Sequence, residues 1–184
     1  MRLTLIRHPR PLVAPDLCYG STDLAVAPEE LARVLTELGP TLPPGLPLFS
    51  SPLRRCAELA TAVAAALPCA SLAFDARLVE IDFGAWEMRR WDDIPRADID
   101  AWAADVAAYR PGGGESVLQM AARVAAFHDQ LLRKQYTGAL VVCHAGTMRL
   151  LAARHAGLSL AQMALKAACA PHQIGYGQCL VLDS

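Results

Sequence analysis

The sequence has no long hydrophobic run and no excess of charge of either sign, and each absence excludes a class of protein. Proline, glycine or a charged residue interrupts every apolar run well before the roughly 20 residues that a membrane-spanning helix needs. The apolar run in the amino-terminal MRLTLIRHPR covers four residues, which is too short for the core of a secretory signal. Lysine and arginine total 17 against 18 aspartates and glutamates, so no overall field favours nucleic acid or an anionic lipid surface. We expect a soluble cytoplasmic protein with no nucleic-acid or membrane partner.

The six cysteines are scattered along the chain and form no C-x-x-C motif. Cys169 and His172 are the one pair at the spacing of metal ligands, and no second pair completes a structural zinc site. Because a reducing compartment keeps thiols reduced, we expect free and mostly buried cysteines rather than disulfides.

The chain does contain enough apolar residues to build a core. Its 184 residues fit the usual size of one domain, and we assign residues 1–184 to a single domain. Hydrophobic residues make up 54% of the chain, and its 34 alanines and 27 leucines favour helix. Short β-rich runs alternate with longer alanine- and leucine-rich stretches, which is typical of an α/β domain. The runs LTLI and ALVVC are nearly continuous, as expected for central strands covered by helices on both faces.

Start and stop signals place the expected elements. Strands are predicted at 3–6, 46–50, 71–74, 139–143 and 178–182. Helices are predicted at 28–38, 52–67, 116–134, 146–156 and 159–168. Ser51, Ser116 and Ser159 are the expected N-caps, Pro52 is the first position of its helix, and Gly157 is a stop.

A segment rich in tryptophan and aspartate follows the third predicted strand. It is expected to be helical after Pro95 and to end at the glycines of PGGG. We interpret residues 88–114 as an insertion or lid rather than as a layer of the sheet.

Ionisable residues follow three of the predicted strands. Arg7 and His8 come directly after LTLI, and His144 comes directly after ALVVC. Arg55 lies at the start of the helix after LPLF, with Arg54 as the alternative. Because ligands of open α/β sheets bind beyond the carboxyl ends of the strands, we expect these side chains to share one crevice. Arginine forks and a helix amino terminus both bind phosphate oxygens, so the pattern predicts a phosphoryl site.

Each residue type suits one step of phosphoryl transfer. His8 can attack phosphorus, because nearby cations favour its neutral form with a free lone pair. His144 can stabilise charge on the phosphoryl oxygens. Glu80, in ARLVEIDFGAWE, can protonate the leaving oxygen and then deprotonate the attacking water, with Asp82 as a neighbouring rival.

Four segments in this order resemble the histidine phosphatases, also called the phosphoglycerate-mutase-like superfamily. They are LTLIRH, SSPLRRCAELA, LVEIDFGAWE and VVCHAGTMRLL. The resemblance implies a three-layer α/β/α sandwich with a mostly parallel central sheet, and a phosphatase that needs no metal or other cofactor. It also implies that His8 carries the phosphoryl group and that Arg7, Arg55, Glu80 and His144 complete the catalytic set.

The sequence departs from the family pattern at positions that carry no catalytic side chain. Pro9 and Arg10 stand where the family commonly has Gly-Glu, and Ala14 stands where mutases commonly carry asparagine. Ala145 replaces the first glycine after the second histidine and is expected to contact the substrate. These departures favour a phosphatase over a mutase.

Within the superfamily, CYGSTDL, FGAWEMRRWDDIP and PGGGES resemble the branch that includes the alpha-ribazole phosphatases of cobalamin biosynthesis. This resemblance implies alpha-ribazole 5'-phosphate, or its cobalamin-linked form, as substrate. It places Tyr19, Gly20 and Ser21 beside the phosphate. It places Trp86 and the stretch 88–110 against the leaving group.

Other functions are left open by the residues themselves. His8, His144 and Glu80 match the ligand set of a metallohydrolase, although two fixed arginines would repel a divalent metal ion. A broad-specificity sugar-phosphate phosphatase, a phosphoglycerate mutase and a non-catalytic phosphoester-binding protein are further alternatives. The sequence carries no oligomerisation motif and leaves a homodimer paired through an edge strand open.

The remaining histidines and tryptophans have ordinary structural explanations. His128 is expected on the surface of a helix, and His155 at a helix end, where a cation is favoured. Trp91 and Trp102 are expected to anchor packing. Whether His172, in a loop, lies near the site is left open.

Overall fold

The computed structural model describes residues 1–170 and 173–183 and contains a five-stranded sheet. In spatial order its strands are β3 (Ser71–Phe74), β2 (Pro47–Ser50), β4 (Gly138–Cys143), β1 (Arg2–Arg7) and β5 (Cys179–Leu182). The first four are parallel, and β5 runs antiparallel along β1. The central strands β1 and β4 are buried almost throughout, as their continuous apolar runs predict. All five predicted strands are confirmed to within one residue.

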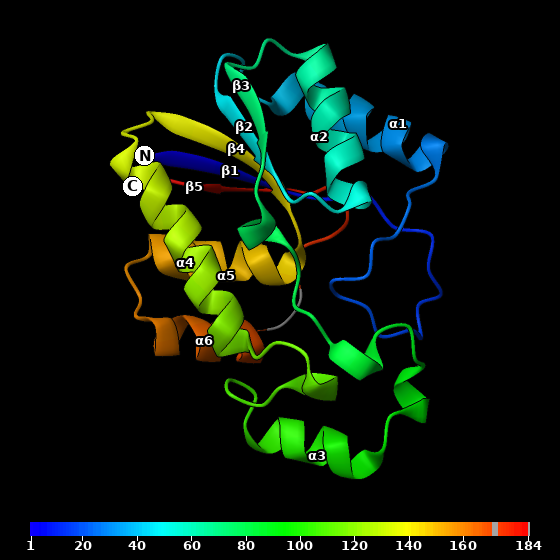
Figure 1. Ribbon diagram of the computed structural model, residues 1–184. Helices are drawn as coiled ribbons and strands as arrows, with labels where there is room; N and C mark the ends of the chain where they lie inside the picture. The colour runs from blue at the N-terminus through cyan, green and yellow to red at the C-terminus, as the bar shows by residue number, and fades with distance from the viewer. Residues whose placement is uncertain (171–172, 184) are drawn as a thin grey trace.

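Helices cover both faces of this sheet (Figure 1). The helices are α1 (Pro28–Leu38), α2 (Arg54–Ala66), α3 (Arg96–Ala104), α4 (Val117–Arg133), α5 (Ala145–His155) and α6 (Leu160–Cys169), of which α3 lies apart from the sheet. In Figure 1, α1 and α2 lie on one side of the sheet and α4 and α5 on the other, with α6 packed against both α4 and α5. The fold is therefore the expected three-layer α/β/α sandwich. No helix in the described part of the chain is long and apolar enough to cross a membrane.

Two of the three predicted serine caps are confirmed. Ser116 and Ser159 each accept a hydrogen bond from the backbone N–H three residues on and form full capping boxes. The prediction for Ser51 was wrong, because α2 begins at Arg54 and its cap position is Leu53. Pro52 was predicted as the first position of this helix and lies before its start as well. The buried hydroxyl of Ser51 lies 2.9 Å from a ring nitrogen of His144 instead of capping the helix.

The core has one cluster on each face of the sheet. Leu3 and Leu5 of β1 pack with α4, α5 and α6, whereas Ile6 packs with α1 and α2, because successive side chains of a strand point to opposite faces. His128 was predicted on the helix surface and is buried instead, at 3% exposure. It lies four residues after Val124 on the inner face of α4, where its Nε2 is 3.2 Å from Nδ1 of His155.

The segment 88–114 lies apart from the sheet, around α3 (Figure 1). Its helix begins directly after Pro95, as predicted. A separate aromatic cluster attaches the segment, with Trp86 packed against Trp102 and Tyr109. The glycine turn at its end is held by close backbone approach, since a Cβ on Gly112 would lie 2.2 Å from the carbonyl oxygen of Phe83.

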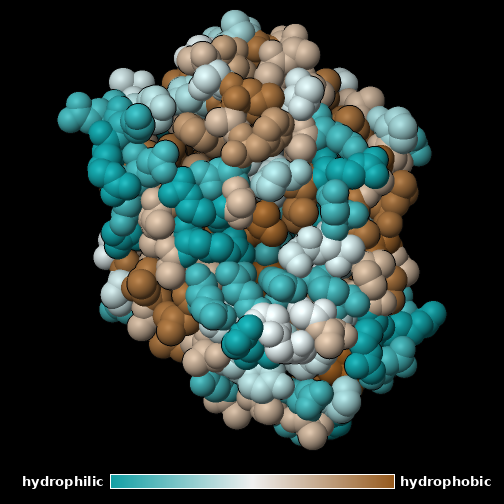
Figure 2. Space-filling view, viewed as in Figure 1, coloured by the Kyte–Doolittle hydropathy of each residue, from teal (hydrophilic) through white to brown (hydrophobic). Residues whose placement is uncertain are grey.

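Hydrophobic areas, in brown, are interspersed with hydrophilic ones, in teal, over the face shown in Figure 2.

The six cysteines are free thiols. Cys18, Cys56 and Cys143 are buried, whereas Cys169 and Cys179 are exposed. The expectation of mostly buried thiols therefore holds for half of them.

Candidate active site

The carboxyl ends of β1, β2 and β4 meet at one edge of the sheet, and the predicted residues gather there. Arg7 ends β1, with His8 next in sequence, while Arg55 lies in the first turn of α2 and His144 is the N-cap of α5. The rings of His8 and His144 are 5.0 Å apart between centroids. All four side chains are at least nine-tenths buried. The strand-end rule thus placed residues from three separate segments in one site.

His8 is held in one tautomer by the backbone. Its Nδ1 lies 2.7 Å from the carbonyl oxygen of Pro9. Because a carbonyl only accepts hydrogen bonds, Nδ1 carries the proton and Nε2 keeps a free lone pair. Burial, and then the charges of Arg55 and Arg7, lower the pKa of His8 well below its usual value. At neutral pH the side chain is therefore uncharged, with its free lone pair on Nε2.

His144 has the opposite tautomer. Nε of Arg55 donates to Nδ1 of His144 at 3.3 Å, so Nδ1 is the acceptor and Nε2 carries the proton. That Nε2 donates to Oγ of Ser51 at 2.9 Å. Burial, the neighbouring His8 and the charge of Arg55 lower the pKa of His144 well below its usual value. His144 is thus a neutral hydrogen-bond donor beside His8.

The two arginines supply fixed positive charge. Besides His144, Arg55 donates to the carbonyl oxygens of Thr22 at 2.6 Å and Gly20 at 2.5 Å. Arg54 lies on the exposed side of α2, where its guanidinium is 3.1 Å from the carboxylate of Glu58. Of the two candidate arginines, the structure therefore brings Arg55 to the site. The guanidinium of Arg7 lies 3.9 Å from the ring centroid of Tyr176, and its buried Nε has no acceptor among the described residues.

Glu80 lies across the site from His8. Its carboxylate accepts hydrogen bonds from the backbone N–H of Gly146 at 2.9 Å and of Ile81 at 3.1 Å. Asp82 was the rival carboxylate in sequence, but its side chain accepts from the N–H of Gly84 and lines a different groove. The structure therefore brings Glu80, and not Asp82, to the histidines.

Glu87 is a site residue that the sequence reasoning missed. Its carboxylate accepts from the backbone N–H groups of Gly20, Ser21, Thr22 and Phe83 at 3.0–3.2 Å. Burial alone would raise the pKa of Glu87, but these bonds and one from the Thr22 hydroxyl outweigh it and lower that pKa. Glu87 fixes the loop whose carbonyl groups bind Arg55. Glu87 could have been found from the sequence, because it is the glutamate of the Trp-Glu pair in the GAWE segment quoted above.

Only some of the residues that were predicted to contact the substrate line the cavity. Tyr19 and Ala145 line the cavity, whereas Gly20 and Ser21 are bound to Glu87 and do not. Trp86 does not line the cavity either, because it is buried in the aromatic cluster at 3% exposure. Tyr176, which the sequence analysis did not select, shares a hydrogen bond of 2.7 Å with the hydroxyl of Tyr19. His172 lies outside the described residues.

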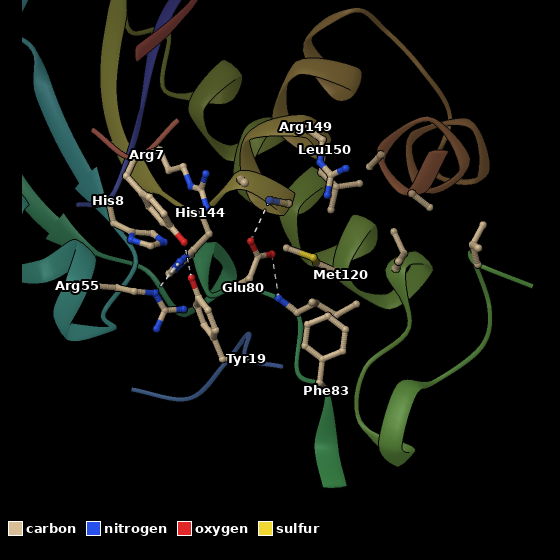
Figure 3. Close-up of a pocket in the computed structure, with 18 of the residues that line it drawn as sticks. Arg7, His8, Tyr19, Arg55, Glu80, Phe83, Met120, His144, Arg149 and Leu150 are labelled. Carbon is tan, nitrogen blue, oxygen red and sulfur yellow. Dashed lines mark hydrogen bonds between the residues drawn. The ribbon is translucent and has the colours of Figure 1, made fainter. Parts of the chain in front are cut away.

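A cavity of about 420 Å³ joins these groups, in the size range of small-molecule sites. Figure 3 shows the histidines, Arg7 and Arg55 on one side of Glu80, and Met120, Arg149 and Leu150 on the other. In the described part of the chain, no three histidine, cysteine, aspartate or glutamate side chains form a group that could hold a metal ion. The ligand set suggested for a metallohydrolase is therefore not assembled from these residues.

The fold and this site define an enzyme that acts on phosphate esters. Residues 3–174 match the histidine phosphatase superfamily (branch 1), and the chain belongs to this family. Its activity class is that of a phosphatase.

Known relatives agree with this assignment. The adenosylcobalamin/alpha-ribazole phosphatase of Escherichia coli (strain K12) is 32% identical over 167 residues, which is 86% of this chain and 80% of that protein. The crystal structure of the alpha-ribazole phosphatase from Shigella flexneri matches with a TM-score of 0.80 and 29% identity, over 100% of this chain and 90% of that one. A mycobacterial glucosyl-3-phosphoglycerate phosphatase shares the fold, with a TM-score of 0.77 at 23% identity over 99% and 89% of the two chains.

Proposed function

We propose that this chain hydrolyses alpha-ribazole 5'-phosphate through a phosphohistidine intermediate on His8. The observation that carries this proposal is the pair of opposite tautomers. His8 presents a free lone pair and His144 presents a proton, 5.0 Å apart between ring centroids and within one cavity. The nucleophile is thus in place before the substrate binds, and the Nε2–H of His144 becomes a donor for the phosphoryl oxygens by exchanging its present acceptor, Oγ of Ser51, for the substrate.

In the first step, Nε2 of His8 attacks phosphorus. A P–N bond forms as the P–O bond to the leaving group breaks, and protonated Glu80 transfers its proton to the leaving oxygen. Arg7, Arg55 and the N–H of His144 stabilise the negative charge on the non-bridging oxygens. The products of this step are the free alcohol and phosphorylated His8.

In the second step, water hydrolyses the phosphohistidine. The carboxylate of Glu80 takes a proton from the water, whose oxygen attacks phosphorus as the P–N bond breaks. Inorganic phosphate leaves, His8 regains its lone pair, and Glu80 is again protonated for the next substrate.

The choice of substrate is supported by the relatives and by the cavity. Two relatives, at 32% and 29% identity, are named for alpha-ribazole esters. Beyond Glu80, the cavity is lined by Phe83, Trp91 and Trp102, which suit the aromatic ring of such an ester. These tryptophans, rather than Trp86, take the leaving-group side in our proposal.

The cytoplasmic location stays a prediction, and so does the homodimer, for which β3 and β5 are the edges of the sheet.

The test is phosphate release from alpha-ribazole 5'-phosphate, p-nitrophenyl phosphate and 3-phosphoglycerate, with EDTA present and with His8→Ala as control. We expect selective hydrolysis of the ribazole ester that resists EDTA and is lost in His8→Ala. Hydrolysis of p-nitrophenyl phosphate alone would contradict the proposed substrate and leave the proposed mechanism standing. Loss of all activity in EDTA would favour the metallohydrolase, and unchanged activity in His8→Ala would overturn the mechanism.

A further inference from the structure

The cavity has two chemically different ends. The end beside the sheet carries the arginines, the histidines and Glu80, and it is the part suited to a phosphoryl group. Beyond Glu80 lies an apolar arm between the 88–114 segment and helices α4, α5 and α6, lined among others by Phe83, Trp91, Trp102, Val117, Met120 and Leu150. Since phosphate has no apolar surface to bury there, the arm is the place for the leaving group.

Arg149 places a cation in the wall of this apolar arm. It lies on α5 one residue before Leu150, and both line the cavity (Figure 3). Its Nη1 donates to the carbonyl oxygen of Ala170 at 3.1 Å, which fixes the guanidinium. Its Nε is buried and has no hydrogen-bond acceptor among the described residues, and no described carboxylate forms an ion pair with it.

Trp102 carries a second donor of the same kind. Its indole lies in the cavity wall, packed against the rings of Phe83, Trp86 and Trp91 at centroid distances of 5.8–6.3 Å. Those neighbours fix the orientation of the indole. Its Nε1 is also buried without an acceptor in the described chain. Arg149 and Trp102 both line the apolar arm, and each has a buried N–H without an acceptor, so a ligand that brings acceptor atoms on an otherwise apolar, planar body would satisfy donors that the described chain leaves unpaired.

We infer that Arg149 and Trp102 determine specificity for the leaving group, by donating hydrogen bonds to the acceptor atoms of an aromatic nucleoside bound in the apolar arm. This inference rests on the proposed function and names the residues that select its substrate. A ribazole leaving group offers both features, because it carries an apolar bicyclic ring together with ribose oxygens and an unprotonated ring nitrogen. Neither residue touches the phosphoryl group, so simple aromatic phosphates do not need them.

The test compares alpha-ribazole 5'-phosphate with benzyl phosphate, a primary alkyl ester with an aromatic ring and no acceptor on its leaving group. We expect Arg149→Met to lower kcat/KM for the ribazole ester about 10-fold or more, and Trp102→Phe, which keeps an aromatic ring but removes the indole N–H together with the five-membered ring that carries it, to lower it about 5-fold. Arg149→Met should hydrolyse benzyl phosphate within about 2-fold of the wild-type rate, whereas Trp102→Phe, which also alters the wall that faces the benzyl ring, should lose less on benzyl phosphate than on the ribazole ester. Arg154→Met is the matched control, since Arg154 lies on the same helix but pairs with Asp129 at 2.8 Å; it should leave both esters unchanged.

Each way in which the inference could fail gives a different pattern of rates on the two esters. Equal losses on both esters in folded Arg149→Met and Trp102→Phe would overturn the specificity role and leave the proposed function standing. Unchanged ribazole turnover in both variants would also overturn it. If the wild type hydrolyses benzyl phosphate and not the ribazole ester, the proposed substrate falls, and the inference falls with it. Thermal melting of each variant separates a lost contact from a lost fold.

Discussion

Nε of Arg55 donates a hydrogen bond to Nδ1 of His144 across 3.3 Å, between two fully buried side chains. This one contact fixes which nitrogen of His144 carries the proton. Two further donors of Arg55 bind the carbonyl groups of Gly20 and Thr22. The arginine therefore sets the tautomer of one histidine, positions a loop and supplies charge at the phosphoryl site.

Replacing Arg55 with lysine keeps the positive charge but should remove the other two effects, because a lysine ammonium has no planar fork to reach His144 and both loop carbonyl groups at once. We expect Arg55→Lys to lower kcat/KM about 100-fold or more, the usual cost of losing an oriented donor at a phosphoryl or oxyanion site. Arg54→Lys is the matched control, since Arg54 is the exposed neighbour on the same turn. Steady-state kinetics with p-nitrophenyl phosphate compares the two. Similar rates for both variants would contradict the role assigned to Arg55.

Glu87 should stabilise the loop at positions 20–22 through its charge. Glu87→Gln leaves one acceptor oxygen for several N–H donors, and we expect a loss of roughly 2–4 kcal/mol in the free energy of unfolding, measured by urea denaturation. Because its folded pKa is lowered, the stabilisation is present above the usual glutamate pKa and is lost as the pH falls through the folded value. The variant should therefore show a weaker acid dependence of stability than the wild type. Glu58→Gln, on the exposed side of α2, serves as the control.

Tyr176 should act on Arg7 mainly through its ring. The guanidinium lies 3.9 Å from the ring centroid, while the hydroxyl is bonded to Tyr19. We expect Tyr176→Phe to keep kcat/KM within about 3-fold and Tyr176→Ala to lower it about 10-fold, the upper range for a cation over a buried ring. Measuring kcat/KM of both variants on one substrate tests this expectation. An equal loss in both would assign the effect to the hydroxyl instead.

The buried His128, which lies beside the partly exposed His155, should make stability depend on pH. Burial, then the nearby His155 and Arg154, lower the pKa of His128, and adjacent Asp129 opposes this without reversing it. A lowered folded pKa means that the unfolded chain takes up the proton first, so stability falls as the pH drops below about 6.5. The slope for one such group is at most about 1.4 kcal/mol per pH unit. Melting curves between pH 5 and 8 should show a smaller drop for His128→Gln than for the wild type, and parallel curves would refute the assignment.

Patterns that depend on local periodicity were readable from the sequence. The five strands, the capped starts of α4 and α6, and the helix after Pro95 follow from apolar runs and cap residues. The gathering of His8, Arg55, Glu80 and His144 followed from strand ends and from the family resemblance.

What the sequence could not give depends on contacts between distant segments. The hydroxyl of Ser51 bonds to His144 instead of capping a helix. Trp86 is turned away from the cavity by its aromatic neighbours, while Trp102 faces it. Tyr176 reaches Tyr19 from the loop before β5, 157 positions along the chain. No local pattern encodes these contacts, because each is decided by how separate elements pack.

The central claim is that His8 carries the phosphoryl group, and Glu80→Gln with p-nitrophenyl phosphate tests it most directly. p-Nitrophenolate is a stable anion that leaves without a proton, so the first step should proceed in this variant, whereas hydrolysis of the phosphohistidine lacks its base. We predict a burst of p-nitrophenolate equal to the enzyme concentration, together with a base-stable, acid-labile phosphoryl group that mass spectrometry of alkali-quenched enzyme locates on His8. Steady turnover by this variant with no burst and no phosphorylated His8, or a phosphoryl group found on His144, would contradict the account.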